Sequence, residues 1–128
     1  MAQTILTRIG WAMSGLFALF MFGASAIPKL AGMAVAKDVM IGLGWPDAPL
    51  ILIGGMELGF TLLFLCPPTA LLGAVLMTGL LGGAIATNLQ AGAPLFSNTL
   101  FAVYLGTFMW TALICRDPRL RAVFPVVR

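Results

Sequence analysis

The sequence predicts an all-α membrane protein, a four-transmembrane-helix bundle with a short interfacial helix between helices 1 and 2. Of its 128 residues, 61% are hydrophobic and only 9% are charged, whereas a soluble domain carries about a quarter charged residues. Four apolar segments approach the roughly 20 residues that span a bilayer, and lipid cannot satisfy free backbone polar groups, so each should be α-helical. These segments are 9–27, 48–66, 68–91 and 95–115, and they make residues 1–128 a single transmembrane domain.

The first segment also resembles a secretory signal, because Arg8 precedes an apolar run that ends near the small residues of Ala24–Ala26. The apolar run continues to Ile27, which makes it long enough to span the bilayer. We therefore expect a retained first helix rather than a cleaved leader.

The link that follows, "PKLAGMAVAKDVMIGLGWPDAP", is long enough to hold a short helix. Its apolar residues would face the membrane, while Lys37 and Asp38 would point outward. Trp45 would lie at headgroup depth, where indole rings are enriched. Two interpretations stay open: a plain interfacial helix, or a flap over the mouth of a pocket.

The remaining links are short. The prolines of "CPPT" forbid a continuous helix between the second and third segments, and "GAP" joins the third to the fourth. Small residues four apart predict close helix packing and place the third helix centrally. They are Gly55 and Gly59 on the second segment, one stripe of Gly79, Gly83 and Thr87 on the third, and a second stripe there of Ala70, Ala74, Thr78, Gly82 and Ala86.

Basic residues predict the topology. An even number of spans puts both termini on the same side of the membrane. Five arginines lie on that side, and two basic residues, Lys29 and Lys37, lie on the other. The positive-inside rule then predicts that both termini and a basic tail, 116–128, lie in the cytoplasm. The net charge of +3 reflects this bias, and no soluble basic face exists for a nucleic-acid partner. The five are Arg8, Arg116, Arg119, Arg121 and Arg128.

The inventory of reactive side chains is short. The chain has no histidine, which excludes imidazole metal ligands and histidine bases. Cys66 and Cys115 form no C-x-x-C motif and are expected at the reducing cytoplasmic end, as small hydrophobic residues. No phosphate-binding, dinucleotide or G-x-S-x-G motif is present. We predict no metal site, and the sequence leaves open whether the protein is an enzyme.

Glu57 is the one charged residue of the segment 48–66. It lies about 13 Å from either helix end, where a charged side chain costs about 2.5 to 3.5 kcal/mol. It must therefore face the interior, be protonated, or be paired. Two interpretations remain: a single structural hydrogen bond, or a polar pocket that opens outward, toward which Ser25, Asn88, Gln90 and Asn98 also lie. The ligand-binding candidates are Glu57, Lys29, Tyr104, Asn88, Trp45 and Thr78.

Several short stretches resemble the DoxX-like family of small four-helix membrane proteins. Members usually carry the lysine and the glutamate that match Lys29 and Glu57, whereas they commonly have histidine at the place of Asn88. No histidine-dependent step of the relatives is therefore carried over. The stretches are "PKLAG", "GLGWP", "GGMELG", "PPTALLGAVLMTGLLGGAIATNL" and "RDPRLRAVFP", which together cover nearly all of the chain.

Some members of that family are membrane subunits of a thiosulfate:quinone oxidoreductase, and others assist the maturation or assembly of other proteins. The resemblance implies a multi-pass protein of the inner (plasma) membrane. It also implies an accessory subunit or binding protein for a quinone or another small amphiphile, beside a membrane redox partner. A homodimer is left open. Two alternatives remain: a small proton-coupled transporter, and an assembly factor for another membrane protein.

The charge bias yields a direct prediction of topology. A reporter enzyme that is active only outside the cytoplasm, fused after Arg128, is expected to stay inactive. Enzyme activity of that fusion in intact cells would contradict cytoplasmic termini.

Overall fold

The computed structural model describes residues 2–127, and every regular element in that part of the chain is a helix. Three helical rods there are long and apolar enough to cross a membrane. The predicted span 48–66 corresponds to α4, Leu50–Leu65, which is apolar but has 16 residues. These cover about 24 Å, less than the roughly 30 Å of a hydrocarbon core. The three rods are Ala2–Leu30, Pro67–Gln90 and Leu95–Arg116.

The first rod is longer than predicted at both ends. It joins α1, Ala2–Phe20, to a π-helix, Met21–Ala26, and to α2, Ile27–Leu30. The predicted start at residue 9 was wrong as a helix boundary, because hydropathy marks the apolar part of a helix and not its polar ends. The rod also continues past Pro28. Proline lacks an N–H and crowds the preceding turn of an α-helix. The turn that precedes Pro28 is π-helical, with i→i+5 hydrogen bonds, rather than α-helical.

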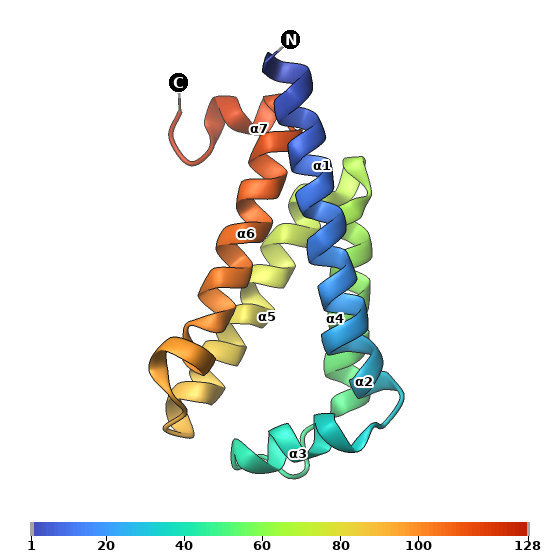
Figure 1. The fold of residues 1–128 in the computed structure, drawn as a ribbon, viewed down its shortest axis with the longest axis vertical. Coiled ribbons are helices and arrows are strands. Elements are labelled where there is room, and N and C mark those ends of the chain that lie inside the picture. Colours follow the sequence, from blue (N-terminus) through green and yellow to red (C-terminus); the bar gives the residue numbers. More distant parts are fainter. Residues whose placement is uncertain (1, 128) are drawn as a thin grey trace.

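The predicted short helix is present as α3, Ala34–Gly42, at the end of the molecule opposite both termini (Figure 1). Gly32 (φ 68°) precedes it and Gly44 (φ 78°) follows it. Both take the left-handed conformation that glycine adopts without strain. No residue of α3 is buried, so this helix lies on the bundle rather than within it.

The other predicted segments agree with the structure to within a few residues. The third becomes a 3₁₀ turn, Pro67–Thr69, followed by α5, Ala70–Gln90, and the fourth becomes a π-helix, Leu95–Thr99, followed by α6, Phe101–Arg116. The tail 116–128 is more ordered than a plain basic tail, because it contains α7, Pro118–Val123. Arg128, counted in the charge bias, lies outside the described residues.

The helices pack as neighbours in a ring, with α1 mainly on α6, α6 on α5, α5 on α4, and the π-helix and α2 on α4. In Figure 1, α5 and α6 diverge from α2 and α4 toward the end where α3 lies. α5 is therefore one member of the ring and not the central helix that was predicted. The largest buried apolar side chains are Phe17, Phe64, Met77, Met109 and Leu113.

Close helix contacts occur at glycines other than those of the predicted stripes. A Cβ on Gly10 would lie 2.4 Å from the backbone nitrogen of Arg116, and one on Gly73 would lie 2.3 Å from that of Phe64. By contrast, a Cβ on Gly55, Gly59, Gly79 or Gly83 would meet nothing within 4 Å. The predicted packing role of those four glycines is wrong.

Arg116 joins three helices at the end where the termini lie. Its side chain is buried although it counted as a basic topology residue. Its Nη1 donates to Ser14 Oγ at 2.8 Å and its Nη2 donates to the carbonyl oxygen of Phe64. The guanidinium lies 4.2 Å from the ring centroid of Trp11 and 4.5 Å from that of Phe64. Hydrogen bonds and ring faces thus replace water around this cation.

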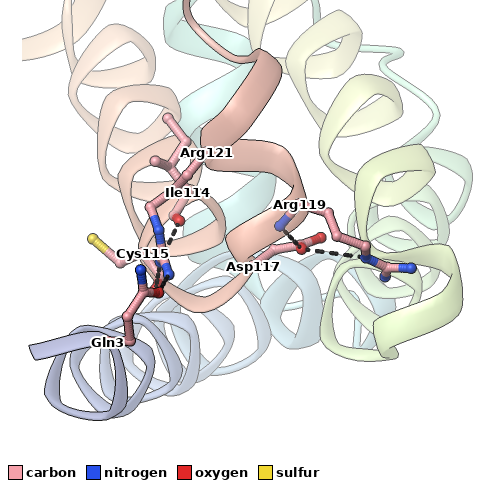
Figure 2. Close-up of polar contacts among 6 residues, drawn as sticks. All are labelled: Gln3, Ile114, Cys115, Asp117, Arg119 and Arg121. Atoms are coloured by element: carbon pink, nitrogen blue, oxygen red, sulfur yellow. Dashed lines mark hydrogen bonds and ion pairs between the residues drawn. The ribbon is translucent and has the colours of Figure 1, made fainter. Parts of the chain in front are cut away.

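α7 folds back over the same end (Figure 2). Asp117 caps it by accepting a hydrogen bond from the backbone N–H of Arg119 at 3.0 Å. Arg121 donates to the carbonyl oxygens of Ile114 and Cys115, where α6 ends, and to the side chain of Gln3 on α1. The last carbonyls of α6 thereby gain partners, and the first turn of α1 is tied to the tail.

The contact at Gly73 predicts a difference between two substitutions on α5. Gly73→Ala should destabilise the protein by about 1–3 kcal/mol, because its methyl group meets the α4 backbone. The matched control Gly79→Ala adds the same methyl group in open space and should leave stability unchanged or slightly raised. Thermal unfolding in detergent micelles measures both. Equal unfolding temperatures would contradict the packing described.

Candidate functional site

Glu57 and Lys29 form an ion pair between α4 and α2. Lys29 Nζ lies 2.9 Å from Glu57 Oε1, and the Glu57 residue is 6% exposed. Gly54, almost one turn before Glu57, lets the two helices approach: a Cβ there would lie 3.0 Å from Lys29 Cβ and 3.1 Å from the carbonyl oxygen of Ala26. The ion pair thus requires that the first rod continues past Pro28 and that the small residue Gly54 faces Lys29.

The two charged groups differ in how fully they are hydrogen-bonded. Besides Glu57, Lys29 Nζ contacts Ser25 Oγ at 2.9 Å and the Ser25 carbonyl oxygen at 3.2 Å. An ammonium group has three hydrogens, so these three acceptors match its capacity. In contrast, Glu57 Oε2 is buried and accepts no hydrogen bond. One carboxylate oxygen of the site is therefore without a partner in the chain.

The pair lies in the wall of a cavity of about 550 Å³. Its lining comes from the first rod, α3 and the loop after it, α4, α5, and the chain from Asn98 to Leu105. Most of that lining is apolar, with Phe20, Phe101 and Met40 among it. The polar side chains are few: Ser25, Lys29, Glu57, Thr87, Asn88 and Asn98.

The family model of the DoxX-like family matches residues 12–112. The chain belongs to the DoxX-like family. The match includes both members of the ion pair and extends into α6. No curated protein and no solved structure matches the chain.

Four of the six candidate residues lie together in this DoxX-like chain. Glu57, Lys29, Asn88 and Trp45 all line the cavity, which also contains Ser25 and Asn98. Their roles as ligand contacts stay predictions, but the proximity that such roles require is present.

Thr78 and Tyr104 lie elsewhere. Thr78 accepts a hydrogen bond from Trp110 Nε1 at 2.8 Å and donates to the carbonyl oxygen of Ala74 at 2.7 Å. It lines a separate hollow of about 500 Å³ between α5 and α6. Tyr104 is 50% exposed and donates to the carbonyl oxygen of Phe96 at 3.3 Å. Tyr104 is absent from the cavity lining, although Phe101, Ala102 and Leu105 of the same helix are part of it.

Sequence reasoning also missed part of the cavity wall. Gly83 and Thr87 of α5 were predicted to pack against another helix, and they line the cavity together with Ala84. Small side chains here leave room for the cavity rather than bringing two backbones together. The pattern alone does not distinguish these two uses, because a stripe of small residues looks the same in both.

The described residues hold no group of three or more histidine, cysteine, aspartate or glutamate side chains that would bind a metal ion. Cys66 and Cys115 are free thiols. The polar groups that the site offers are one ion pair and a few amide and hydroxyl groups.

The ion pair predicts a coupling between two substitutions. Lys29→Met strands a buried carboxylate and should destabilise the protein by roughly 3–5 kcal/mol. Glu57→Gln removes the counter-charge of Lys29 and should also destabilise it. The double variant should lose less stability than the sum of the two single variants.

Thermal unfolding of the four proteins in detergent measures this coupling. Lys37→Met provides the control, because Lys37 lies on the exposed α3 and its removal should change little. Strict additivity of the two single effects would remove the pair as a stabilising interaction.

Proposed function

We propose that this DoxX-like protein binds a quinone, or an amphiphile of similar size, in the cavity beside Glu57. In this proposal it serves as an accessory subunit or binding protein next to a membrane redox partner. The observation that carries the proposal is the buried ion pair of Lys29 and Glu57 in the wall of a mostly apolar cavity of about 550 Å³.

The shape and chemistry of the cavity support a small amphiphile. Small-molecule sites are commonly about 300–1,000 Å³, apolar, and equipped with a few placed polar groups. Here Phe20, Phe101 and Trp45 supply aromatic surface, while Glu57 and Asn88 supply polar contacts. A quinone head group has the matching pattern, a flat apolar ring with oxygen atoms at two positions.

We also propose a four-span topology in the inner membrane with both termini in the cytoplasm. Supporting this, α1 begins and α7 lies at one end of the bundle (Figure 1), and most basic residues are there. α4 would be a span in addition to the three long rods, which gives four in total. Its 16 residues are short for a span, and local thinning of the bilayer accommodates such a helix. α3 would lie at the outer interface, which places the cavity in the outer half of the membrane.

A proton-coupled transporter is the competing function, because it would also use a membrane carboxyl group. Such a carboxyl must be free to exchange a proton for its substrate. Glu57 Oε1 is already engaged by Lys29 at 2.9 Å, which favours a fixed binding site over a carboxyl group that cycles between partners.

Binding is testable through Trp45. Titration of the purified protein in detergent with a short-tailed ubiquinone should quench tryptophan fluorescence in a saturable way, and Trp45→Phe should remove most of that signal. Trp11 and Trp110 are not in the cavity lining, so their emission provides the internal reference.

Two substitutions on α5 separate cavity binding from partition into the micelle. Ala84→Phe fills the cavity and should weaken binding at least about tenfold, whereas Ala86→Phe adds the same ring outside the cavity lining and should not. Equal binding by both variants, or unsaturable quenching in the unmodified protein, would overturn the proposed function.

A further inference from the structure

The hydrogen-bonding state of the ion pair points to the kind of ligand that the cavity selects. Lys29 Nζ has an acceptor for each of its three hydrogens: Glu57 Oε1 and two atoms of Ser25. It has no hydrogen left to donate to a ligand. The strongest donor in the cavity wall is therefore already used within the chain.

The free position at the pair is an acceptor. Glu57 Oε2 is buried and has no hydrogen-bond partner, and a buried polar atom without a partner is unfavourable. The terminal torsion of a glutamate side chain is broad and nearly two-fold. A partial rotation within this broad range can bring Oε2 to the surface of the cavity that Glu57 lines while Oε1 stays near Lys29. Only a group that carries a hydrogen can satisfy that oxygen.

The charge of the ion pair limits which kind of hydrogen-bond donor a ligand can carry. The pair of Lys29 and Glu57 has no net charge, so a cationic ligand would add an uncompensated charge to a mostly apolar cavity. A neutral hydroxyl group avoids that penalty. It can also accept a hydrogen bond while it donates one, for example from the hydroxyl of Ser25, which lines the same cavity.

Asn88 provides a second hydrogen-bond acceptor in the cavity wall. Asn88 Nδ2 donates to the carbonyl oxygen of Ala84 at 2.8 Å, which leaves its Oδ1 as an acceptor. Asn98 differs, because its Oδ1 accepts from Ser97 Oγ at 2.8 Å and its amide hydrogens stay free. A second ligand hydroxyl group can donate to Asn88 Oδ1, whereas a ligand carbonyl oxygen cannot use that acceptor and pairs only with donors such as the amide hydrogens of Asn98.

We propose that the cavity selects a neutral, hydroxyl-bearing ring, so that the reduced dihydroxy (quinol) form binds in preference to the oxidised quinone. This inference rests on the proposed function, because it assumes that a ring of this size occupies the cavity. It goes further by naming the state of the ligand and the atom that discriminates, Glu57 Oε2. Sites built to pair with a ligand hydroxyl reject the analogue that lacks it, because the buried partner is left unpaired.

The test compares three ligands of one shape on the unmodified protein in detergent: a short-tailed ubiquinol kept reduced without oxygen, the same ubiquinone, and the dimethyl ether of the quinol. The quinol should bind at least about tenfold more tightly than both others. A quinone that binds as tightly as the quinol would overturn this inference and leave the proposed function standing. If none of the three binds, the proposed function itself fails.

A variant checks that Glu57 is the discriminating group. In Glu57→Gln the amide oxygen can keep Lys29, and the amide NH₂ then replaces the free acceptor with a donor. The preference for quinol should disappear or reverse. Asp38→Asn, the control, removes an acidic charge from α3 outside the cavity lining and should keep the preference. An unchanged preference in a folded Glu57→Gln protein would overturn the inference, and the three-ligand comparison decides it without any variant.

Discussion

A carboxylate in the middle of an apolar helix needs a partner, and the ion pair of Glu57 with Lys29 provides it. That contact requires the first rod to continue past Pro28 and α2 to lie close to α4 at Gly54. Both requirements hold one side of the cavity in place, while α5 and α6 diverge from it. Loss of the pair would thus affect the stability of the end of the bundle where α3 lies and the polarity of the cavity together.

The molecule contains a second buried cation, and the contrast between the two is informative. Arg116 is surrounded by acceptors and ring faces from α1 and α4, where Gly10 and Gly73 allow close packing. That end of the bundle is closed and its buried polar side chains are paired within the chain. At the other end, Glu57 Oε2 has no partner. The paired guanidinium of Arg116 favours a structural role for that residue. The unpaired oxygen of Glu57 favours a binding role for Glu57.

Hydropathy predicted the helical class, the order of the segments and the place of Glu57 in the middle of its helix, because all three follow from position along the chain. Direction around the helix was harder to predict. Lys29 was a correct partner, whereas Thr78 and Tyr104 have suitable depth but point elsewhere. Helix rotation depends on packing against all neighbours, and the sequence of one segment does not contain that information. The same limit explains why Gly83 was assigned to a helix contact and lines a cavity instead.

The π-helical turn Met21–Ala26 has a consequence for how such a site can arise. An i→i+5 turn holds one more residue than the i→i+4 turn of an α-helix, so it is equivalent to an α-helix with one inserted residue. An insertion of this kind rotates everything that follows by roughly 100°. Without this π-helical turn, α2 would follow the same axis, but the side chain of Lys29 would point away from Glu57. A single codon gained or lost in this stretch would therefore part the acid from its lysine without any substitution in the other helices of the cavity wall.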